Sequence, residues 1–97
     1  MKGKPIEVSA TAGILSIKIQ DREIINERIG DKWLFDLTYA EAITYKEAFY
    51  SESKKCAVKG DYRGSKELRA SYNNFRRYIA HYEQAQNYIN QKSINTL

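Results

Sequence analysis

The strongest constraint in this sequence is a change of hydrophobic period at Thr38. Before it, apolar residues alternate with polar ones at 6–11 and 14–20, which is the period-2 pattern of half-buried strands. After it, apolar residues recur at steps of three and four, the pattern of amphipathic helices. The sequence therefore predicts an α+β fold in which an N-terminal antiparallel sheet over residues 1–37 is followed by helices.

Four short strands joined by hairpins account for the first part of the chain. Turn-forming residues at 21–22 and 30–32 separate two further strands, expected at 23–29 and 33–37. The isoleucine pair at 24–25 breaks the alternation, so we expect either a bulge there or partial cover of both sheet faces. The expected architecture is a four-stranded β-meander with two helices packed on one face.

The first helix is predicted over residues 38–60. Thr38 and Glu41 have the spacing of a capping box, in which each side chain satisfies the other residue's free backbone N–H group. Gly60 is suited to the left-handed position that ends a helix. We expect the following connector to lead to Ser65 as the cap of a second helix.

The second helix is predicted over residues 65–92, with a frayed tail at 93–97. Its apolar seam follows alternating steps of four and three residues: Leu68, Tyr72, Phe75, Ile79, Tyr82, Gln86 and Ile89. A helix over 66–91 is about 39 Å long, whereas a compact domain of this length is about 32 Å across. We therefore expect one domain, residues 1–97, from which the end of the second helix projects or packs on something else.

Catalytic and metal chemistry have little support in the sequence. The chain has one cysteine and one histidine, which excludes an intramolecular disulfide and a multi-cysteine zinc site. The glycines form no nucleotide-binding loop, and the acidic residues do not have the spacing of a metal-binding loop. Cys56 and His81 are interpreted as a small packed residue and a solvent- or partner-facing residue. We expect a protein that is not an enzyme, has no cofactor and binds no small molecule.

Membrane insertion is not expected either. The sequence has no apolar run of about 18 residues, and its first twenty residues contain several charges and no apolar core of a signal peptide. We expect the cytoplasm as the compartment, or the host cytoplasm if the protein is encoded by a phage.

Positive charge is concentrated in the helical half. The net charge of the chain is +4, but residues 54–77 hold eight basic and two acidic residues. Lys66, Arg69, Asn73 and Arg76 are stepped as one helical stripe, and Arg and Asn are residues that contact phosphates and base edges. Solvation of an ordinary exposed helix face is the alternative. The candidate binding residues are Lys54, Lys55, Lys59, Tyr62, Arg63, Lys66, Arg69, Asn73, Arg76 and Arg77.

Tyrosines are also confined to the helical half, where all eight occur at or after Tyr39. Four of them lie off the apolar stripes: Tyr45, Tyr62, Tyr78 and Tyr88. Exposed tyrosine beside arginine is typical of interface hot spots and of base-stacking surfaces. The candidate seam for self-association or for a partner comprises Tyr78, Ile79, Tyr82, Tyr88 and Ile89.

Two functions follow from this surface. The first is docking through the basic, tyrosine-rich helices onto a protein partner, which includes a second copy of the chain or a host complex that binds nucleic acid. A four-stranded sheet with two helices is similar to some small phage-encoded inhibitors of host defence complexes. That similarity implies an inhibitor or adaptor of a phage or mobile element acting on nucleic-acid-handling machinery.

The second function is direct binding of nucleic acid by the Arg/Lys stripe of the second helix, with the homodimer as one form. Three strands followed by a capped helix resemble the small arm-binding domains of tyrosine recombinases. In those domains the sheet enters the groove of the DNA, whereas the charge here lies on the helices. The sequence ranks protein docking slightly ahead, because a net charge of +4 supplies little nonspecific affinity for DNA and because the aromatic helical half suits a desolvated interface.

Overall fold

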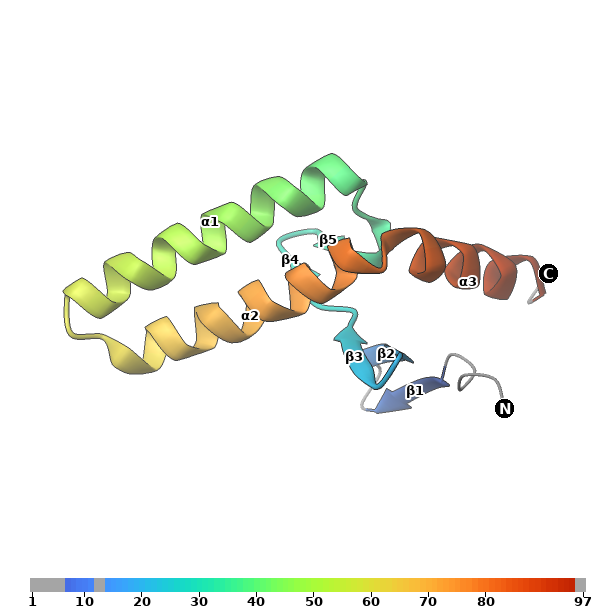
Figure 1. Ribbon diagram of the computed structural model, residues 1–97, viewed down its shortest axis with the longest axis horizontal. Coiled ribbons are helices and arrows are strands. Elements are labelled where there is room, and N and C mark those ends of the chain that lie inside the picture. Colours follow the sequence, from blue (N-terminus) through green and yellow to red (C-terminus); the bar gives the residue numbers. More distant parts are fainter. Residues whose placement is uncertain (1–6, 12–13, 96–97) are drawn as a thin grey trace.

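The protein has an α+β fold in which short antiparallel strands precede the helices (Figure 1). The computed structural model describes the backbone of residues 7–11 and 14–95 and the side chains of residues 14–90. Within these residues the elements are β1 (Glu7–Thr11), β2 (Ile14–Ile19), β3 (Arg22–Ile25), β4 (Arg28–Ile29), β5 (Lys32–Trp33), the 3₁₀ turn η1 (Leu34–Asp36), α1 (Tyr39–Val58), α2 (Tyr62–Ala80) and α3 (Tyr82–Asn95). The class predicted from the sequence is confirmed.

The strands do not form the single four-stranded meander expected from the sequence. In the described part of the chain, β1, β2 and β3 form one antiparallel sheet, and β4 and β5 form a separate hairpin. The expected last strand at 33–37 is mostly η1. The reason is that Leu34, Phe35 and Leu37 are all buried, which a strand with one buried face does not allow and a helical turn does.

The turn between β2 and β3 lies one residue earlier than expected, at Gln20 and Asp21, whose φ angles are 53° and 64°. Two successive positive φ angles are the signature of the tight hairpin turn that matches strand twist. The pairing on either side is regular, with Ile17 opposite Ile24 and Ser16 opposite Ile25. The isoleucine pair at 24–25 therefore causes no bulge there: Ile24 is fully buried and Ile25 is 37% exposed.

The capping box at the start of α1 is confirmed. The Thr38 hydroxyl accepts a hydrogen bond from the Glu41 N–H, and the Glu41 carboxylate accepts one from the Thr38 N–H. The Thr38 N–H and the Lys32 ammonium, 3.1 Å from the carboxylate, hold the pKa of Glu41 below its usual range. Gly60, with φ of 86°, follows the end of α1 as expected.

The cap of α2 is Asp61, and the expectation that Ser65 caps it is wrong. The Asp61 carboxylate accepts a hydrogen bond from the Gly64 N–H at 3.0 Å, so the helix begins one turn earlier. A Cβ at position 64 would collide with that carboxylate, which is why glycine suits this place. Ser65 is buried within the first turn of α2.

The predicted helix 65–92 is two helices, because the chain bends at His81, where φ and ψ are −119° and 29°. Neither proline nor glycine causes the bend. Instead, it lets Ala85 pack in the core and lets the Gln86 amide donate to the carbonyl oxygen of Phe35 at 3.2 Å. Residues 93–95 are helical and not a frayed tail, while residues 96 and 97 lie outside the described part.

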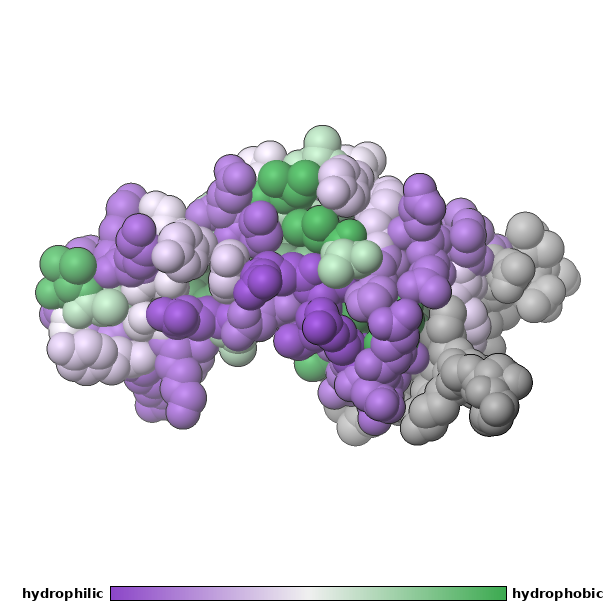
Figure 2. Space-filling model, in the orientation of Figure 1, coloured by the Kyte–Doolittle hydropathy of each residue, from purple (hydrophilic) through white to green (hydrophobic). Residues whose placement is uncertain are grey.

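The molecule is elongated. Its radius of gyration is 14.7 Å and its extents are 47 × 33 × 27 Å, against about 12.5 Å for the radius of a compact chain of this length. The α1–α2 turn lies at one end and α3 at the other (Figure 1). Figure 2 shows a hydrophobic patch over the middle of the molecule and a smaller one at the end that holds the α1–α2 turn. In the described residues, no helix combines the length and the apolar character needed to cross a bilayer.

The sheet is joined to α2 by the side chain of Asn74, which is 2% exposed. Its Oδ1 accepts from the Ile25 N–H at 2.9 Å, and its Nδ2 donates to the Ile25 carbonyl oxygen at 2.8 Å. Nδ2 also donates to the Glu27 carboxylate at 2.9 Å. The amide thus pairs the Ile25 N–H at the edge of the sheet and adds a second hydrogen bond to the Ile25 carbonyl oxygen, which also accepts from the Glu27 N–H.

Tyr78 makes a second polar link inside the core. Its hydroxyl donates to the Leu37 carbonyl oxygen at 3.1 Å and accepts from the Gln86 amide. Its ring stacks on Phe35, with centroids 6.0 Å apart. Burial is the main reason that the pKa of Tyr78 lies well above its usual value.

We predict that replacing Asn74 destabilises the fold while replacing its neighbour does not. Asn74→Ala leaves the Ile25 N–H without its partner and removes the hydrogen bonds of Nδ2 to the Ile25 carbonyl oxygen and the Glu27 carboxylate. This should lower the free energy of unfolding by about 2 kcal/mol and the melting temperature by roughly 8–16 °C. Asn73→Ala, on the exposed side of α2, should stay within about 0.5 kcal/mol of wild type. Thermal and urea denaturation test this, and equal effects of the two substitutions would contradict the role of Asn74.

We also predict that Tyr78 makes the fold sensitive to alkaline pH. The tyrosine ionises near pH 10 in the unfolded chain but at higher pH in the folded protein. Protonated Tyr78 therefore makes its full contribution to the free energy of unfolding below pH 10. As the pH rises above 10, this contribution falls by up to about 1.4 kcal/mol per pH unit. In urea titrations above pH 10, Tyr78→Phe should show a shallower loss of stability than wild type. Parallel curves would contradict this prediction.

Candidate anion-binding surface

The predicted stripe on the second helix is exposed along its whole length. Lys66, Arg69, Asn73 and Arg76 all project from the side of α2 that the core does not use. Tyr62 and Ala80 continue the same line at its two ends and are exposed as well, because steps of three and four residues keep side chains on one helix face. We call these six residues of α2 the α2 row.

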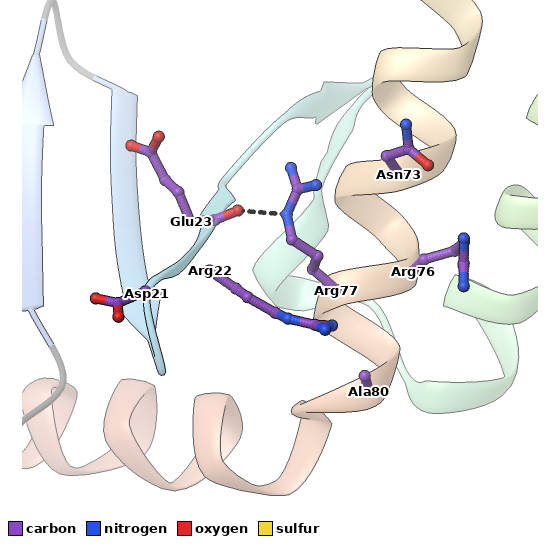
Figure 3. Close-up of a pocket in the computed structure, with 7 residues that line it drawn as sticks. All are labelled: Asp21, Arg22, Glu23, Asn73, Arg76, Arg77 and Ala80. Atoms are coloured by element: carbon purple, nitrogen blue, oxygen red, sulfur yellow. Dashed lines mark hydrogen bonds between the residues drawn. The ribbon is translucent and has the colours of Figure 1, made fainter. Parts of the chain in front are cut away.

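A groove of about 520 Å³ lies between the β2–β3 hairpin and the C-terminal half of α2 (Figure 3). It brings three residues expected to bind a partner, Asn73, Arg76 and Arg77, together with one that was not expected, Arg22. The remaining lining residues are Asp21, Glu23 and Ala80. Strand alternation puts Arg22 on the same side of β3 as buried Ile24. Only the packing of β3 on α2 makes that side part of a binding surface.

Two arginine side chains cross the groove in opposite directions. Arg77 reaches from α2 to β3, where its Nε donates to the Glu23 carbonyl oxygen at 2.7 Å, and Arg22 reaches from β3 toward α2 (Figure 3). A guanidinium has five N–H donors, so the bond to Glu23 fixes Arg77 and leaves its other donors for a ligand. Arg76 is oriented by Tyr72, whose ring centroid is 5.7 Å from the guanidinium carbon.

The groove keeps its positive charge because nearby carboxylates point elsewhere. In Figure 3 the carboxylates of Asp21 and Glu23 lie on the side of the hairpin away from α2. Across residues 14–90, the ion pairs are formed by other basic residues, in the pairs Lys32–Glu41, Lys55–Glu52 and Arg63–Glu67. The guanidinium groups of the groove are therefore not neutralised by these acidic side chains.

The other predicted basic residues lie at the α1–α2 turn, beyond the N-terminal end of the α2 row. Lys54 lies over the Tyr50 ring, 4.9 Å from its centroid, and Arg63 is 3.7 Å from Glu67. Lys54, Lys55 and Lys59 border a shallow depression of about 340 Å³ that also includes Ser51 and Val58. The predicted binding residues thus extend from the α1–α2 turn along the α2 row to the groove at the other end of α2.

The seam predicted for self-association is not a continuous exposed face. Tyr78 is fully buried, and Tyr88 and Ile89 are partly buried against the core. Ile79 and Tyr82 do reach a groove of about 650 Å³ at the α2–α3 bend, whose other residues are Tyr39, Ala80, His81, Glu83 and Gln84. All five residues of the expected seam therefore pack on the core of this chain, and two of them, Ile79 and Tyr82, also line the groove at the bend.

Most of the tyrosines that lie off the apolar stripes also belong to the interior. Tyr78 is buried, Tyr45 and Tyr88 pack on the core, and Tyr62 is 73% exposed. A chain of 97 residues has few large side chains with which to fill its core, so the aromatic residues fill it. This leaves the helical surface more basic and less aromatic than the sequence suggested.

Cys56 lies in α1, and His81 lies at the bend between α2 and α3. Cys56 is half-buried in α1, and the ring of His81 is 3.3 Å from the Gln84 side-chain oxygen. Among the residues that the structure describes, no three His, Cys, Asp or Glu side chains come together as metal ligands. Positive charge and accessible space coincide in the groove beside the α2 row and in the lysine-lined depression at the α1–α2 turn.

Comparisons with models of known protein families, with curated proteins and with solved structures found no match. The function must therefore be inferred from the chemistry of the α2 row and the groove.

Proposed function

We propose that this protein binds nucleic acid through the phosphate backbone, along the α2 row and into the groove beside it. The observation that supports this most strongly is the opposed pair Arg22 and Arg77 in an open groove of about 520 Å³. Guanidinium groups match phosphate oxygens in geometry and stay charged at any physiological pH. A ligand with regularly spaced phosphates fits the groove and the row together.

The spacing of the row suits such a ligand. Successive basic or amide side chains are three or four residues apart, which is about 4.5–6 Å along a helix. From Lys66 to Arg76 the row covers about 15 Å, and Arg22 adds a contact from the neighbouring hairpin. The opposite side of the sheet offers less charge, because Lys18 is paired across the strands with Glu23.

Burial of the aromatic residues favours nucleic acid over the protein docking that the sequence ranked first. That ranking depended on a tyrosine-rich surface, but Tyr78 lies inside the core and Tyr45 and Tyr88 pack against it. The basic residues of the row are all exposed. The net charge of the whole chain is only +4, but arginines are concentrated at the groove. Phosphate contacts depend on the charge near the phosphates rather than on the net charge.

We predict that removing one arginine of the groove weakens binding in a salt-dependent way. Fluorescence anisotropy with short single-stranded and duplex DNA, between about 50 and 200 mM salt, gives the slope of log affinity against log salt. Arg22→Gln and Arg76→Gln should each lower that slope by about one phosphate contact, or roughly 0.7–0.9. Lys18→Gln removes the same charge on the far side of β2 and should leave the slope unchanged.

The result that would overturn this proposal is specific. If the wild-type protein binds neither DNA nor RNA at low salt, nucleic acid is not its ligand. If Lys18→Gln weakens binding as much as Arg22→Gln, the effect is one of net charge, and the groove is not the site.

Docking to protein is the second candidate, and the groove at the α2–α3 bend favours it. Tyr39, Ile79 and Tyr82 line this groove of about 650 Å³, and Tyr39 is 49% exposed. Aromatic residues in a concave surface are typical of protein interfaces. An inhibitor or adaptor of a phage or mobile element, acting on nucleic-acid-handling machinery, stays a prediction under either candidate.

For this second candidate we predict self-association through the bend. Light scattering over a concentration series should give a mass approaching twice 11.3 kDa, and Tyr39→Glu should restore the monomer. An acidic residue suits the first turn of α1, so this substitution should not disturb the helix. A monomer mass at every concentration would remove the second copy as the partner.

A further inference from the structure

We infer that the ligand of the α2 row is single-stranded nucleic acid, with an unpaired base stacked on the ring of Tyr62. This inference rests on the proposed function and adds to it the class of nucleic acid and the residue that selects it. It follows from the position of Tyr62 in the α2 row, from its exposure and from the charges beside it.

Tyr62 lies on the same helix face as the basic residues of the row. The steps from Tyr62 to Lys66, Arg69, Asn73 and Arg76 are four, three, four and three residues. At 3.6 residues per turn, all of these positions fall within about 40° of the Tyr62 direction. A strand that follows the row toward the N-terminus of α2 therefore meets this aromatic ring at the end of its path.

The ring of Tyr62 is 73% exposed and is not used in packing. The other tyrosines that are more than a third exposed have ring neighbours: Tyr39 contacts Tyr82 with centroids 5.5 Å apart, and Tyr50 contacts Tyr72 at 5.1 Å. Within residues 14–90, Tyr62 forms no ring pair of this kind. An accessible aromatic face without a structural role is available for a base.

Basic residues flank Tyr62 in the chain, next to the capping carboxylate of Asp61. Lys59 and Arg63 are its close neighbours in the chain, and Lys66 follows one turn along α2; all three are exposed. Aromatic rings among basic residues are the usual composition of single-strand binding sites, because each nucleotide brings both a flat base and a phosphate. A duplex offers phosphates and base edges but no free base face for stacking, since its bases are already paired and stacked.

The length of the path sets the length of the ligand. Tyr62 and Arg76 are separated by about 21 Å along α2, which equals roughly six steps of 3.4 Å in a stacked strand. A strand of about ten nucleotides can therefore contact the groove and Tyr62 together, whereas one of about three nucleotides cannot.

The test uses the full chain and three labelled probes: a strand of about ten thymidines, the same strand with abasic sites, and a duplex. Tyr62→Ala should weaken binding to the thymidine strand by about 5- to 100-fold, which corresponds to loss of one stacked base. Tyr62→Phe keeps the ring and should bind like wild type. Lys18→Gln, on the far side of β2, is the control for a nonspecific effect of substitution and should also bind like wild type.

The outcomes separate this inference from the proposed function. It is supported if Tyr62→Ala affects the thymidine strand and leaves the abasic strand and the duplex unchanged. It is overturned, with the proposed function intact, if Tyr62→Ala binds the thymidine strand like wild type while Arg22→Gln still lowers the salt slope. It also falls if Tyr62→Ala weakens binding to all probes equally. If no probe binds the wild-type protein at low salt, the proposed function fails first.

Discussion

The arrangement of the whole molecule depends on one amide, the side chain of Asn74. A β-sheet of three short strands has little apolar area with which to hold a helix, and the edge of β3 would otherwise present the Ile25 N–H without a partner. The Asn74 side chain accepts from that N–H and donates to the Ile25 carbonyl oxygen, which also accepts from the Glu27 N–H. It lies three residues from Arg77 in α2, and Ile25 lies three residues from Arg22 in β3. The same contact that joins sheet and helix therefore sets the two arginines across the groove.

A second constraint fixes the course of the chain after α2. Tyr78 and Gln86 bind each other and the carbonyl oxygens of Leu37 and Phe35. The η1 turn, α2 and α3 thus share one polar cluster inside the core. Among the side chains of residues 14–90, no buried nitrogen or oxygen is left without a partner, so this cluster is fully satisfied. Because a straight helix would carry Gln86 away from Phe35, the bend at His81 is the geometric consequence of these bonds.

Local chemistry made several features predictable from the sequence. The capping box joins Thr38 and Glu41, which are only three residues apart. The positive φ angle of Gly60 is a property of that residue alone. The spacing from Lys66 to Arg76 is set within one helix. The features that sequence reasoning missed depend on contacts over long separations. Arg22 belongs to the groove only because β3 packs on α2, some fifty residues later in the chain. Tyr78 lies off the apolar stripes in the sequence, as an exposed tyrosine would. Only its contacts with the Leu37 carbonyl and the Phe35 ring show that it faces inward. The break at His81 has no local signal, since the residues that require it are Ala85 and Gln86.

The two sides of α2 have separate tasks, and this separation shapes what evolution or mutagenesis can change. Asn74, Phe75 and Tyr78 fix the helix against the sheet and the core, so their side chains cannot vary without a cost in stability. The α2 row lies on the opposite side and makes few contacts that the fold needs. Its residues are therefore free to be selected for a ligand, yet they are held in a rigid register by the buried side of the same helix. A basic row on a helix whose position is fixed by buried hydrogen bonds is preorganised. Less conformational entropy of side chains and backbone is then lost on binding than in a flexible basic segment. A modest net charge can therefore support specific contacts.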